Sequence, residues 1–355
     1  MHIIYDFCHF SKKVFTFRTY LIDFLKIFTS IALILQLFFV FGQNDNMING
    51  VSLVSTKELL DSSQLTPVVS LNANWTAVIP YAFLANEHRP DLVYDMDGQW
   101  IGERIHGTRA AIYLCRQNGL KVMVKPQIWV GSGGFTGHID MNSDADWEFF
   151  EMNYRKFILA FAQVAEEEGA EMFCIGTEMN KSAKKRPEFW RQLIKEVREI
   201  YSGQLTYAEN WDCYDDVSFW NELDFIGVDA YFPLTIKSRP TKKDLSSGWE
   251  RLELDLSQFC SDLNMQMIFT EYGYRSISNC AHKPWNYNMR GNYSEEAQVN
   301  ALNALYKVMW DKEYFAGGFL WKWHPDHENA GGRENTAYTV QNKKAEMLVR
   351  EVYGH

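Results

Sequence analysis

The chain has 355 residues and a formal net charge of −10, and phenylalanine, tryptophan and tyrosine make up 15% of it. An acidic chain with no basic tract beyond its N-terminal region is unsuited to nucleic acid, so we expect no such partner. The length suits one α/β barrel of about 250 residues with added loops. Most of the aromatic rings are expected in the core, and a few as flat platforms for sugars.

The N-terminal region predicts a targeting segment. Basic residues outweigh acidic ones in residues 1–26, and an apolar run of 15 residues from Ile27 to Phe41 ends at Gly42. These features are typical of a secretory signal, and the run is shorter than the ~18–20 residues that span a bilayer. We expect residues 1–42 to be a signal peptide, or alternatively a retained anchor and the one membrane contact. The protein would then be secreted or periplasmic, with residues 43–355 as its folded domain.

Residues 50–352 alternate between short apolar runs and amphipathic stretches, which is typical of repeated βα units. Eight runs are predicted as strands: Gly50–Ser55, Trp75–Phe83, Leu120–Val130, Met172–Glu178, Leu205–Trp211, Leu223–Tyr231, Gln266–Tyr272 and Ala316–Trp323. The predicted helices are Asp144–Glu168, Pro187–Tyr201, Ser247–Leu263, Glu295–Lys312 and Gln341–Tyr353. Several strands are almost wholly apolar at their starts, as parallel strands buried on both faces are. The sequence therefore predicts an α/β fold with a single domain, a (β/α)₈ TIM barrel.

The cysteines and histidines do not indicate a metal site. Five cysteines follow the N-terminal segment without a CxxC pair, and the histidines form no HxH or HExxH pattern. Cys115 and Cys174 lie in apolar runs and are predicted to be buried. A disulfide between two of the other three, Cys213, Cys260 and Cys280, remains open.

Two glutamates end predicted strands and are the candidates for chemistry. Glu178 closes the run "FCIGTEMN" at its fourth strand, and Glu271 lies in "MIFTEYGY" at the seventh. The active site of a (β/α)₈ barrel lies at the C-terminal ends of its strands, so the two face each other across the barrel mouth. One such glutamate alone would be read as a salt-bridge partner. A pair among many aromatic residues favours two carboxyl groups that cleave a glycosidic bond.

Other polar and aromatic residues at the strand ends are candidates for substrate binding. Lys125 is expected to pair with a carboxylate or to reach the substrate, because an unpaired buried ammonium is costly. Trp321 and Trp323 are two residues apart, so both are expected on one side of their strand, with one as a sugar platform. The alternative to substrate binding is a salt bridge for Asp229 and a position in the core for the tyrosines. The full candidate set is Lys125, Trp129, Asn210, Trp211, Asp229, Tyr231, Tyr272, Trp321 and Trp323.

The segments "KVMVKPQIWV", "IGTEMN", "TEYGY" and "GGFLWKW" resemble glycoside hydrolase family 113, a family of retaining β-mannanase barrels in clan A. The resemblance covers roughly residues 50–352. It implies that Glu178 is the general acid/base and Glu271 the nucleophile of a double displacement. Many clan members have asparagine before the acid glutamate, where this chain has Thr177, as is usual in the family. Asn210 is the candidate for the lost contact with the sugar 2-hydroxyl.

The expected function is therefore a glycosidase that cleaves a β-1,4-linked polysaccharide or oligosaccharide, above all β-mannan. No metal or organic cofactor is required by this chemistry. The first alternative is the same mechanism on another β-glycan, such as glucan or glucomannan. The second is a catalytically silent barrel that binds carbohydrate through its aromatic residues. The glycine-rich loop at residues 131–146 is expected to cover the site.

Overall fold

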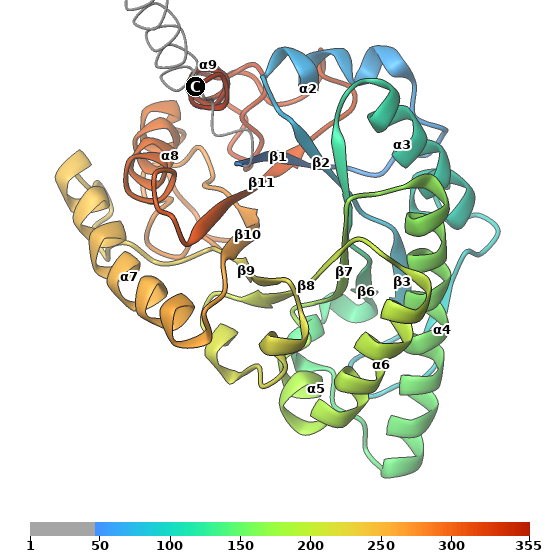
Figure 1. Cartoon of the computed structure of the whole chain (residues 1–355). Helices are drawn as coiled ribbons and strands as arrows, with labels where there is room; N and C mark the ends of the chain where they lie inside the picture. Colours follow the sequence, from blue (N-terminus) through green and yellow to red (C-terminus); the bar gives the residue numbers. More distant parts are fainter. Residues whose placement is uncertain (1–46) are drawn as a thin grey trace, which may run out of the picture. The chain divides into compact units, whose positions relative to one another are not determined.

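The computed structural model describes residues 47–355, so the predicted signal segment lies outside the described residues. Parallel strands close into an eight-stranded barrel with helices on its outside, which confirms the predicted (β/α)₈ fold (Figure 1). In chain order the barrel strands are β1 Ile48–Leu53, β2 Trp75–Val78, β5 Lys121–Val124, β7 Met172–Thr177, β8 Gln204–Asn210, β9 Phe225–Asp229, β10 Met267–Tyr272 and β11 Phe315–Trp323.

The helices that surround the barrel largely follow the predicted spacing. They are α2 Thr66–Ser70, α3 Ile105–Gln117, α4 Asp144–Glu168, α5 Asn180–Lys185, α6 Pro187–Ile200, α7 Lys242–Leu263, α8 Glu295–Met309 and α9 Lys344–Tyr353. Helix α4 has the predicted ends because Ser143 caps its first turn and Gly169 ends it in the left-handed region. Helix α7 begins earlier than predicted, since Thr241 and Asp244 form a capping box. No helix within residues 47–355 is long and apolar enough to cross a membrane.

Two predicted strands are each divided in the structure. Trp75–Phe83 becomes β2 and β3 (Tyr81–Leu84), and Leu120–Val130 becomes β5 and β6 (Gln127–Val130). A proline interrupts each of them, Pro80 and Pro126, because proline has no N–H for the strand ladder. The outer pieces β3 and β6 join β4 (Val93–Tyr94) in a separate three-stranded sheet. This sheet extends the wall beyond the C-terminal ends of β2 and β5.

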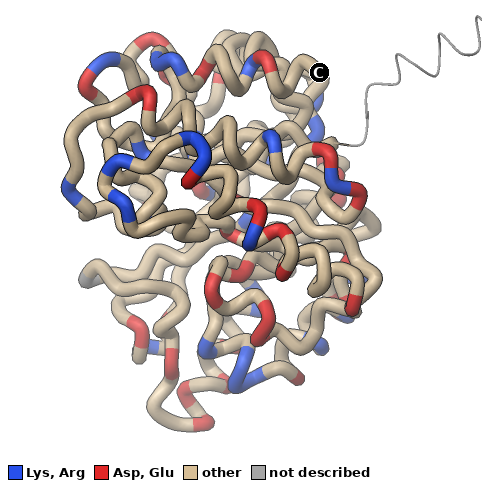
Figure 2. Tube along the Cα trace, turned by 90° about the vertical axis from the view of Figure 1, so that its left-hand side faces the viewer, with Lys and Arg blue, Asp and Glu red and all other residues tan. Residues whose placement is uncertain are grey.

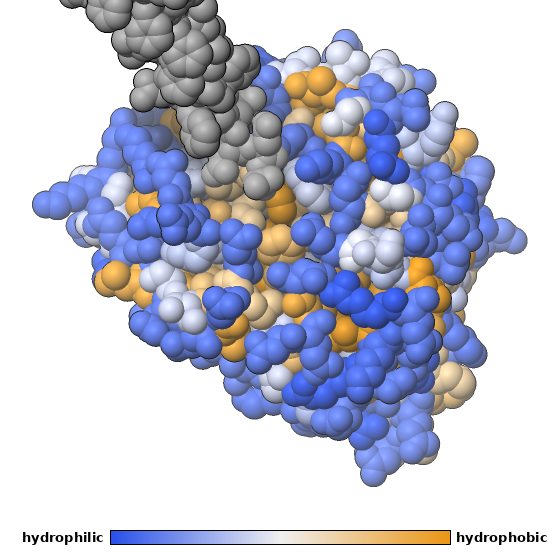
Figure 3. All heavy atoms as spheres, viewed as in Figure 1, coloured by the Kyte–Doolittle hydropathy of each residue, from blue (hydrophilic) through white to orange (hydrophobic). Residues whose placement is uncertain are grey.

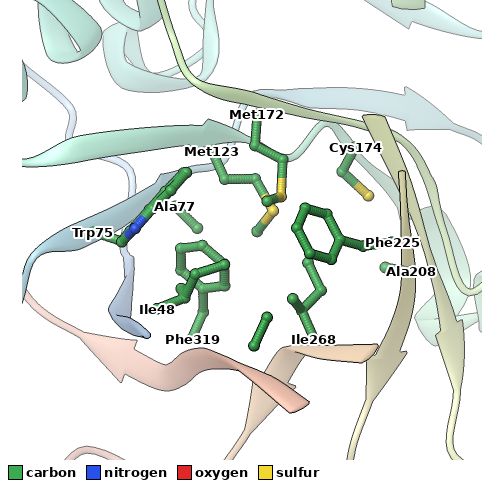
Figure 4. Packing of buried hydrophobic residues seen from close by; sticks show 11 residues of the cluster. Ile48, Trp75, Ala77, Met123, Met172, Cys174, Ala208, Phe225, Ile268 and Phe319 are labelled. Carbon is green, nitrogen blue, oxygen red and sulfur yellow. The ribbon is translucent and has the colours of Figure 1, made fainter. Parts of the chain in front are cut away.

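Apolar side chains fill the barrel interior (Figure 4). The cluster consists of Ile48, Trp75, Ala77, Met123, Met172, Cys174, Ala208, Phe225, Ile268, Ala316 and Phe319. Gly50 makes room for it, because a Cβ there would lie 2.5 Å from the Phe319 ring. All five cysteines of residues 47–355 are free, and the predicted burial of Cys115 and Cys174 is confirmed.

Bulges interrupt the strand pairing where the barrel approaches its C-terminal end. The register shifts between Cys174 and Thr177 in β7, and between Phe269 and Glu271 in β10. A third shift separates Leu320 from Trp323 in β11. A bulge changes the direction in which the following side chains point, so simple alternation does not predict which residues face the mouth.

The surface is polar and mixed in charge. Acidic and basic residues are interspersed along the trace, without a continuous stripe of basic residues on the face shown (Figure 2). Hydrophilic side chains surround the more apolar centre of the face in Figure 3.

Candidate active site

A cavity of about 840 Å³ opens where the barrel strands end, and both predicted glutamates line it. Glu178 directly follows β7, and Glu271 lies near the end of β10. Seven aromatic side chains share the lining with them: Trp129, Phe135, Tyr231, Trp285, Tyr287, Trp321 and Tyr338. Within residues 47–355, no cluster of His, Cys, Asp or Glu is suited to hold a metal ion.

Glu271 is held by three hydrogen-bond donors. Its Oε1 accepts from Lys125 Nζ at 2.6 Å and from Gln127 Nε2 at 2.8 Å. Its Oε2 accepts from the Tyr231 hydroxyl at 2.8 Å. Only 6% of the residue is exposed. Three donors and one positive charge stabilise a carboxylate and fix the direction in which it points.

The charge beneath Glu271 belongs to a buried network. Lys125 Nζ also lies 2.9 Å from Asp229 Oδ1, and both side chains are fully buried. Thr270 donates a further hydrogen bond to Asp229. Burial opposes the ammonium form of Lys125, but the carboxylates of Asp229 and Glu271 outweigh it and raise its pKa. Burial and the charge of Glu271 raise the pKa of Asp229 to about 7. The lysine therefore remains charged and supports the carboxylate of Glu271.

Glu178 lies in a contrasting environment. Its side chain forms no hydrogen bond or ion pair with residues 47–355, and burial raises the pKa of its carboxyl well above the usual range. The nearby carboxylates of Asp229 and Glu271 raise it further. Its backbone lies in the left-handed region, with φ at 52°. Such a conformation is unfavourable for a residue with a Cβ, and strain of this kind is typical of functional sites.

Aromatic residues line much of the cavity around the two glutamates. Trp129 is 62% exposed and, with Trp321, separates this cavity from a neighbouring one of about 1000 Å³ that contains Trp100. Trp285, which lines only the cavity of the glutamates, stacks on Trp211 with 4.8 Å between ring centroids. The two cavities share Trp129, Trp321 and Lys322 in their linings, and together they form a cleft that is longer than the cavity that holds the glutamates.

The structure brings together part of the predicted binding set. Trp129, Asn210, Tyr231 and Trp321 line the cavity, although Tyr231 also serves as a donor to Glu271. Trp211 is not among the lining residues, because the Trp285 ring lies against it.

Four residues of the predicted set lie elsewhere, which corrects the expectation that they bind substrate. Lys125 and Asp229 are fully buried and pair with each other, the alternative considered for each. Tyr272 is buried and hydrogen-bonds to the hydroxyls of Tyr306 and Tyr353. Trp323 is fully buried and stacks on His327, so it does not share the cleft with Trp321. The bulges in β10 and β11 account for the last two, since they break the expected alternation.

Several lining residues were not in the predicted set. Gln127 is two residues beyond Lys125 in a strand whose polar end was recognised, so alternation alone could have identified it. Trp285, Tyr287 and Tyr338 belong to long loops without periodicity, and only the fold places them at the cleft. Residues 133–136 of the glycine-rich loop line the cavity as well.

The sequence profile of glycoside hydrolase family 113 matches residues 56–343. The chain belongs to this family. It is therefore a glycoside hydrolase with a TIM-barrel fold, and the resemblance seen in the sequence is confirmed. No curated protein matches the chain in sequence.

Solved structures of the same fold agree with this assignment. A family 113 β-mannanase from Alicyclobacillus acidocaldarius, solved with ManMIm, is 24% identical with a TM-score of 0.76, over 87% of this chain and 97% of that one. A second family 113 β-1,4-mannanase is 23% identical with a TM-score of 0.74, over 87% and 99% of the two chains. A β-glucuronidase from Faecalibacterium prausnitzii is 14% identical with a TM-score of 0.59, over 87% of this chain and 49% of that one. At these identities the likeness concerns the fold.

Proposed function

We propose that this family 113 member is a retaining, endo-acting hydrolase of β-1,4-mannan, with Glu271 as nucleophile and Glu178 as general acid/base. The observation that carries the proposal is the contrast between the two carboxyl groups of one cleft. Glu271 accepts three hydrogen bonds and pairs with a buried ammonium. Glu178 has no such donors, and burial raises its pKa. Environments that favour the charged form of one carboxyl group and the neutral form of the other assign the two roles.

The mechanism follows from these two environments. The Glu271 carboxylate attacks the anomeric carbon while the protonated Glu178 gives its proton to the departing glycosidic oxygen. The Glu178 carboxylate then removes a proton from water, which attacks the glycosyl ester and releases Glu271. Two inversions give a product with retained configuration. Tyr231 and Lys125 hold the nucleophile in place through both steps.

The substrate assignment is supported by the family and by the cleft. Family 113 structures of this fold are described as β-mannanases and β-1,4-mannanases. A neutral polysaccharide suits flat rings such as Trp129, Trp321 and Trp285, which stack on the apolar faces of sugars. The second cavity adjoins the one that holds the glutamates, so the space available to sugar units extends beyond the position of the bond that is cut. This arrangement favours endo action.

The test is the release of products by the purified protein from β-1,4-mannan, glucomannan, cellulose and xylan oligomers. We expect cleavage of mannan oligomers at internal bonds. Nuclear magnetic resonance should show that the β-anomer of the product forms first. Cleavage of another oligomer alone would keep the mechanism and replace the substrate. Binding without cleavage would favour the silent barrel, and the α-anomer as first product would contradict the retaining mechanism.

We also propose that residues 1–42 direct the protein out of the cytoplasm, so that it meets a polymeric glycan outside the cell. The support is the basic segment followed by a short apolar run. N-terminal sequencing of the protein from an expressing culture checks this. A mature chain that begins near residue 43 is expected, and a full-length chain would favour an anchor.

A further inference from the structure

A short series of hydrogen bonds begins at the residue after the acid/base candidate Glu178, and its central members, Tyr207 and Glu209, do not line the cavity. The N–H of Met179, the residue after Glu178, donates to the hydroxyl of Tyr207 at 2.9 Å. The Tyr207 hydroxyl donates in turn to Oε2 of Glu209 at 3.1 Å. The other oxygen of Glu209 accepts from the N–H of Asn210 at 2.8 Å. Each group in this series has a defined direction, since an N–H can only donate and the hydroxyl then has its proton free for Glu209.

These hydrogen bonds hold a strained part of the backbone. Glu178 has φ at 52°, and its own N–H donates to the carbonyl of Ala208 at 2.7 Å. The peptide groups before and after the Glu178 side chain are thus both tied to β8. A left-handed conformation at a glutamate costs about 1–2 kcal/mol and persists only where its surroundings enforce it. The Tyr207 hydroxyl supplies that enforcement on the C-terminal side.

The Tyr207 ring is tightly packed among other aromatic rings. It is fully buried and packs against Trp190, Phe219 and Trp220 with 5.1, 5.5 and 6.0 Å between ring centroids. These contacts leave the hydroxyl in one position, so its partner on the Met179 side is held in one position as well.

Burying Glu209 is energetically unfavourable, which argues against a purely structural role. It is fully buried, and it forms no ion pair with any basic residue of the described chain. Burial raises its pKa to about 8. A buried carboxyl group without a cationic partner destabilises the fold, and its two hydrogen bonds offset only part of that. The role that this geometry gives it is to orient the Tyr207 hydroxyl.

We infer that Tyr207 and Glu209 are positioning residues, which hold the Met179 peptide so that the Glu178 carboxyl group points at the glycosidic oxygen. The inference rests on the proposed acid/base role of Glu178. Neither residue contacts substrate in this scheme, and both act through the backbone. Their loss should therefore impair proton transfer and leave nucleophilic attack by Glu271 largely intact.

The test compares kcat/KM for two aryl β-mannobiosides. The phenyl substrate needs a proton on its leaving oxygen, whereas 2,4-dinitrophenolate departs without one. Tyr207→Phe should lower kcat/KM about 10-fold or more for the phenyl substrate, a fraction of what general acid catalysis contributes. For the dinitrophenyl substrate it should change kcat/KM by less than about 3-fold. Glu209→Gln, which accepts one of the two hydrogen bonds, should give the same split in a weaker form.

Tyr201→Phe is the matched control. Tyr201 is equally buried, and its hydroxyl donates to the carbonyl of Ala170 at 2.8 Å, at the opposite end of β7. Like Tyr207→Phe, this variant should have a lower melting temperature, but its effect on kcat/KM should be the same for both substrates. Equal losses on both substrates in Tyr207→Phe, or no loss on either, would overturn the inference.

The same pair of substrates separates this inference from the proposed function. Glu178→Ala should show the largest split of all the variants. If Glu178→Ala shows a split and Tyr207→Phe does not, only the positioning role fails. If Glu178→Ala shows none, the acid/base assignment itself is wrong.

Discussion

The ammonium nitrogen of Lys125 lies 2.6 Å from Oε1 of Glu271, and no part of the lysine side chain reaches solvent. Lys125 directly follows β5 and Glu271 lies in β10, on different sides of the barrel. Asp229 shares the same ammonium at 2.9 Å. Two carboxylates and one lysine thus form a buried network with more acidic than basic groups, and its lysine is the member that the other two depend on.

Replacing this lysine should damage both stability and activity. In Lys125→Met, two neighbouring buried carboxyl groups lose their counter-charge, and breaking such a pair typically costs about 3–5 kcal/mol of unfolding free energy. Turnover at pH 7 should fall by at least about 100-fold, because Glu271 loses a preorganised electrostatic partner. Urea unfolding and steady-state kinetics measure the two effects.

Two further variants control for this result. Lys121→Met makes the same substitution at the exposed start of β5 and should leave both quantities nearly unchanged. Lys125→Met combined with Asp229→Asn removes one of the unpaired acids, so it should recover part of the stability without the activity. A stable and active Lys125→Met protein would contradict the importance of the network.

The two glutamates should respond differently to azide. Turnover by Glu271→Ala should be about 10⁴-fold lower. Azide should restore turnover and give an α-glycosyl azide as product, because one direct displacement inverts the anomeric carbon. Glu178→Ala should form the intermediate from activated aryl glycosides and then stall. Azide should release that intermediate as a β-glycosyl azide. Nuclear magnetic resonance of the products distinguishes the two, and exchanged configurations would reverse the assignment of roles.

The architecture could be predicted from the sequence because it depends on period and composition. The eight apolar runs all correspond to barrel strands, and α4 follows from Ser143, its helical spacing and Gly169. The division of two strands was also visible in principle, since Pro80 and Pro126 lie inside them. Helix α3 was not predicted, although it is a full helix of 13 residues.

The site was harder to predict because it depends on local departures from regular structure. Glu178 and Glu271 follow bulges, and the same bulge in β10 turns Tyr272 out towards α8 and α9. A register shift that carries no residue signature cannot be read from alternation. Trp285 reaches the cleft from a loop whose path depends on tertiary contacts, such as the stacking on Trp211.

The raised pKa of Glu178 predicts the shape of the pH–rate profile. The general acid must be protonated in the free enzyme, so kcat/KM falls as pH rises through the pKa of Glu178. Burial and the neighbouring carboxylates of Asp229 and Glu271 raise that pKa well above the usual range for a glutamate. The alkaline limb for a phenyl glycoside should therefore lie above the ordinary titration range of a carboxyl group.

A substrate that needs no proton donor is the control for this assignment. With a 2,4-dinitrophenyl glycoside, kcat/KM should lose the alkaline limb that belongs to Glu178. In Glu178→Ala the two substrates should give profiles of the same shape. A limb that persists in Glu178→Ala with the phenyl substrate would assign it to another group.

The exposed rings at the two ends of the cleft should contribute to binding on different sides of the scissile bond. Trp129 is 62% exposed and lines both cavities, whereas Trp285 is 41% exposed and lines only the cavity that holds the glutamates. Loss of one aromatic stacking contact is worth about 0.5–1.5 kcal/mol, so Trp129→Ala and Trp285→Ala should each raise KM for long oligomers up to about 10-fold. Because each variant weakens one side, the two should shift the cleavage position of a labelled mannohexaose in opposite directions.

Tyr113→Ala, a change at an exposed ring of α3 outside both cavity linings, should alter neither KM nor the products. Identical product patterns in the two tryptophan variants would mean that the rings serve the same side, and the endo-acting cleft would then need a different account.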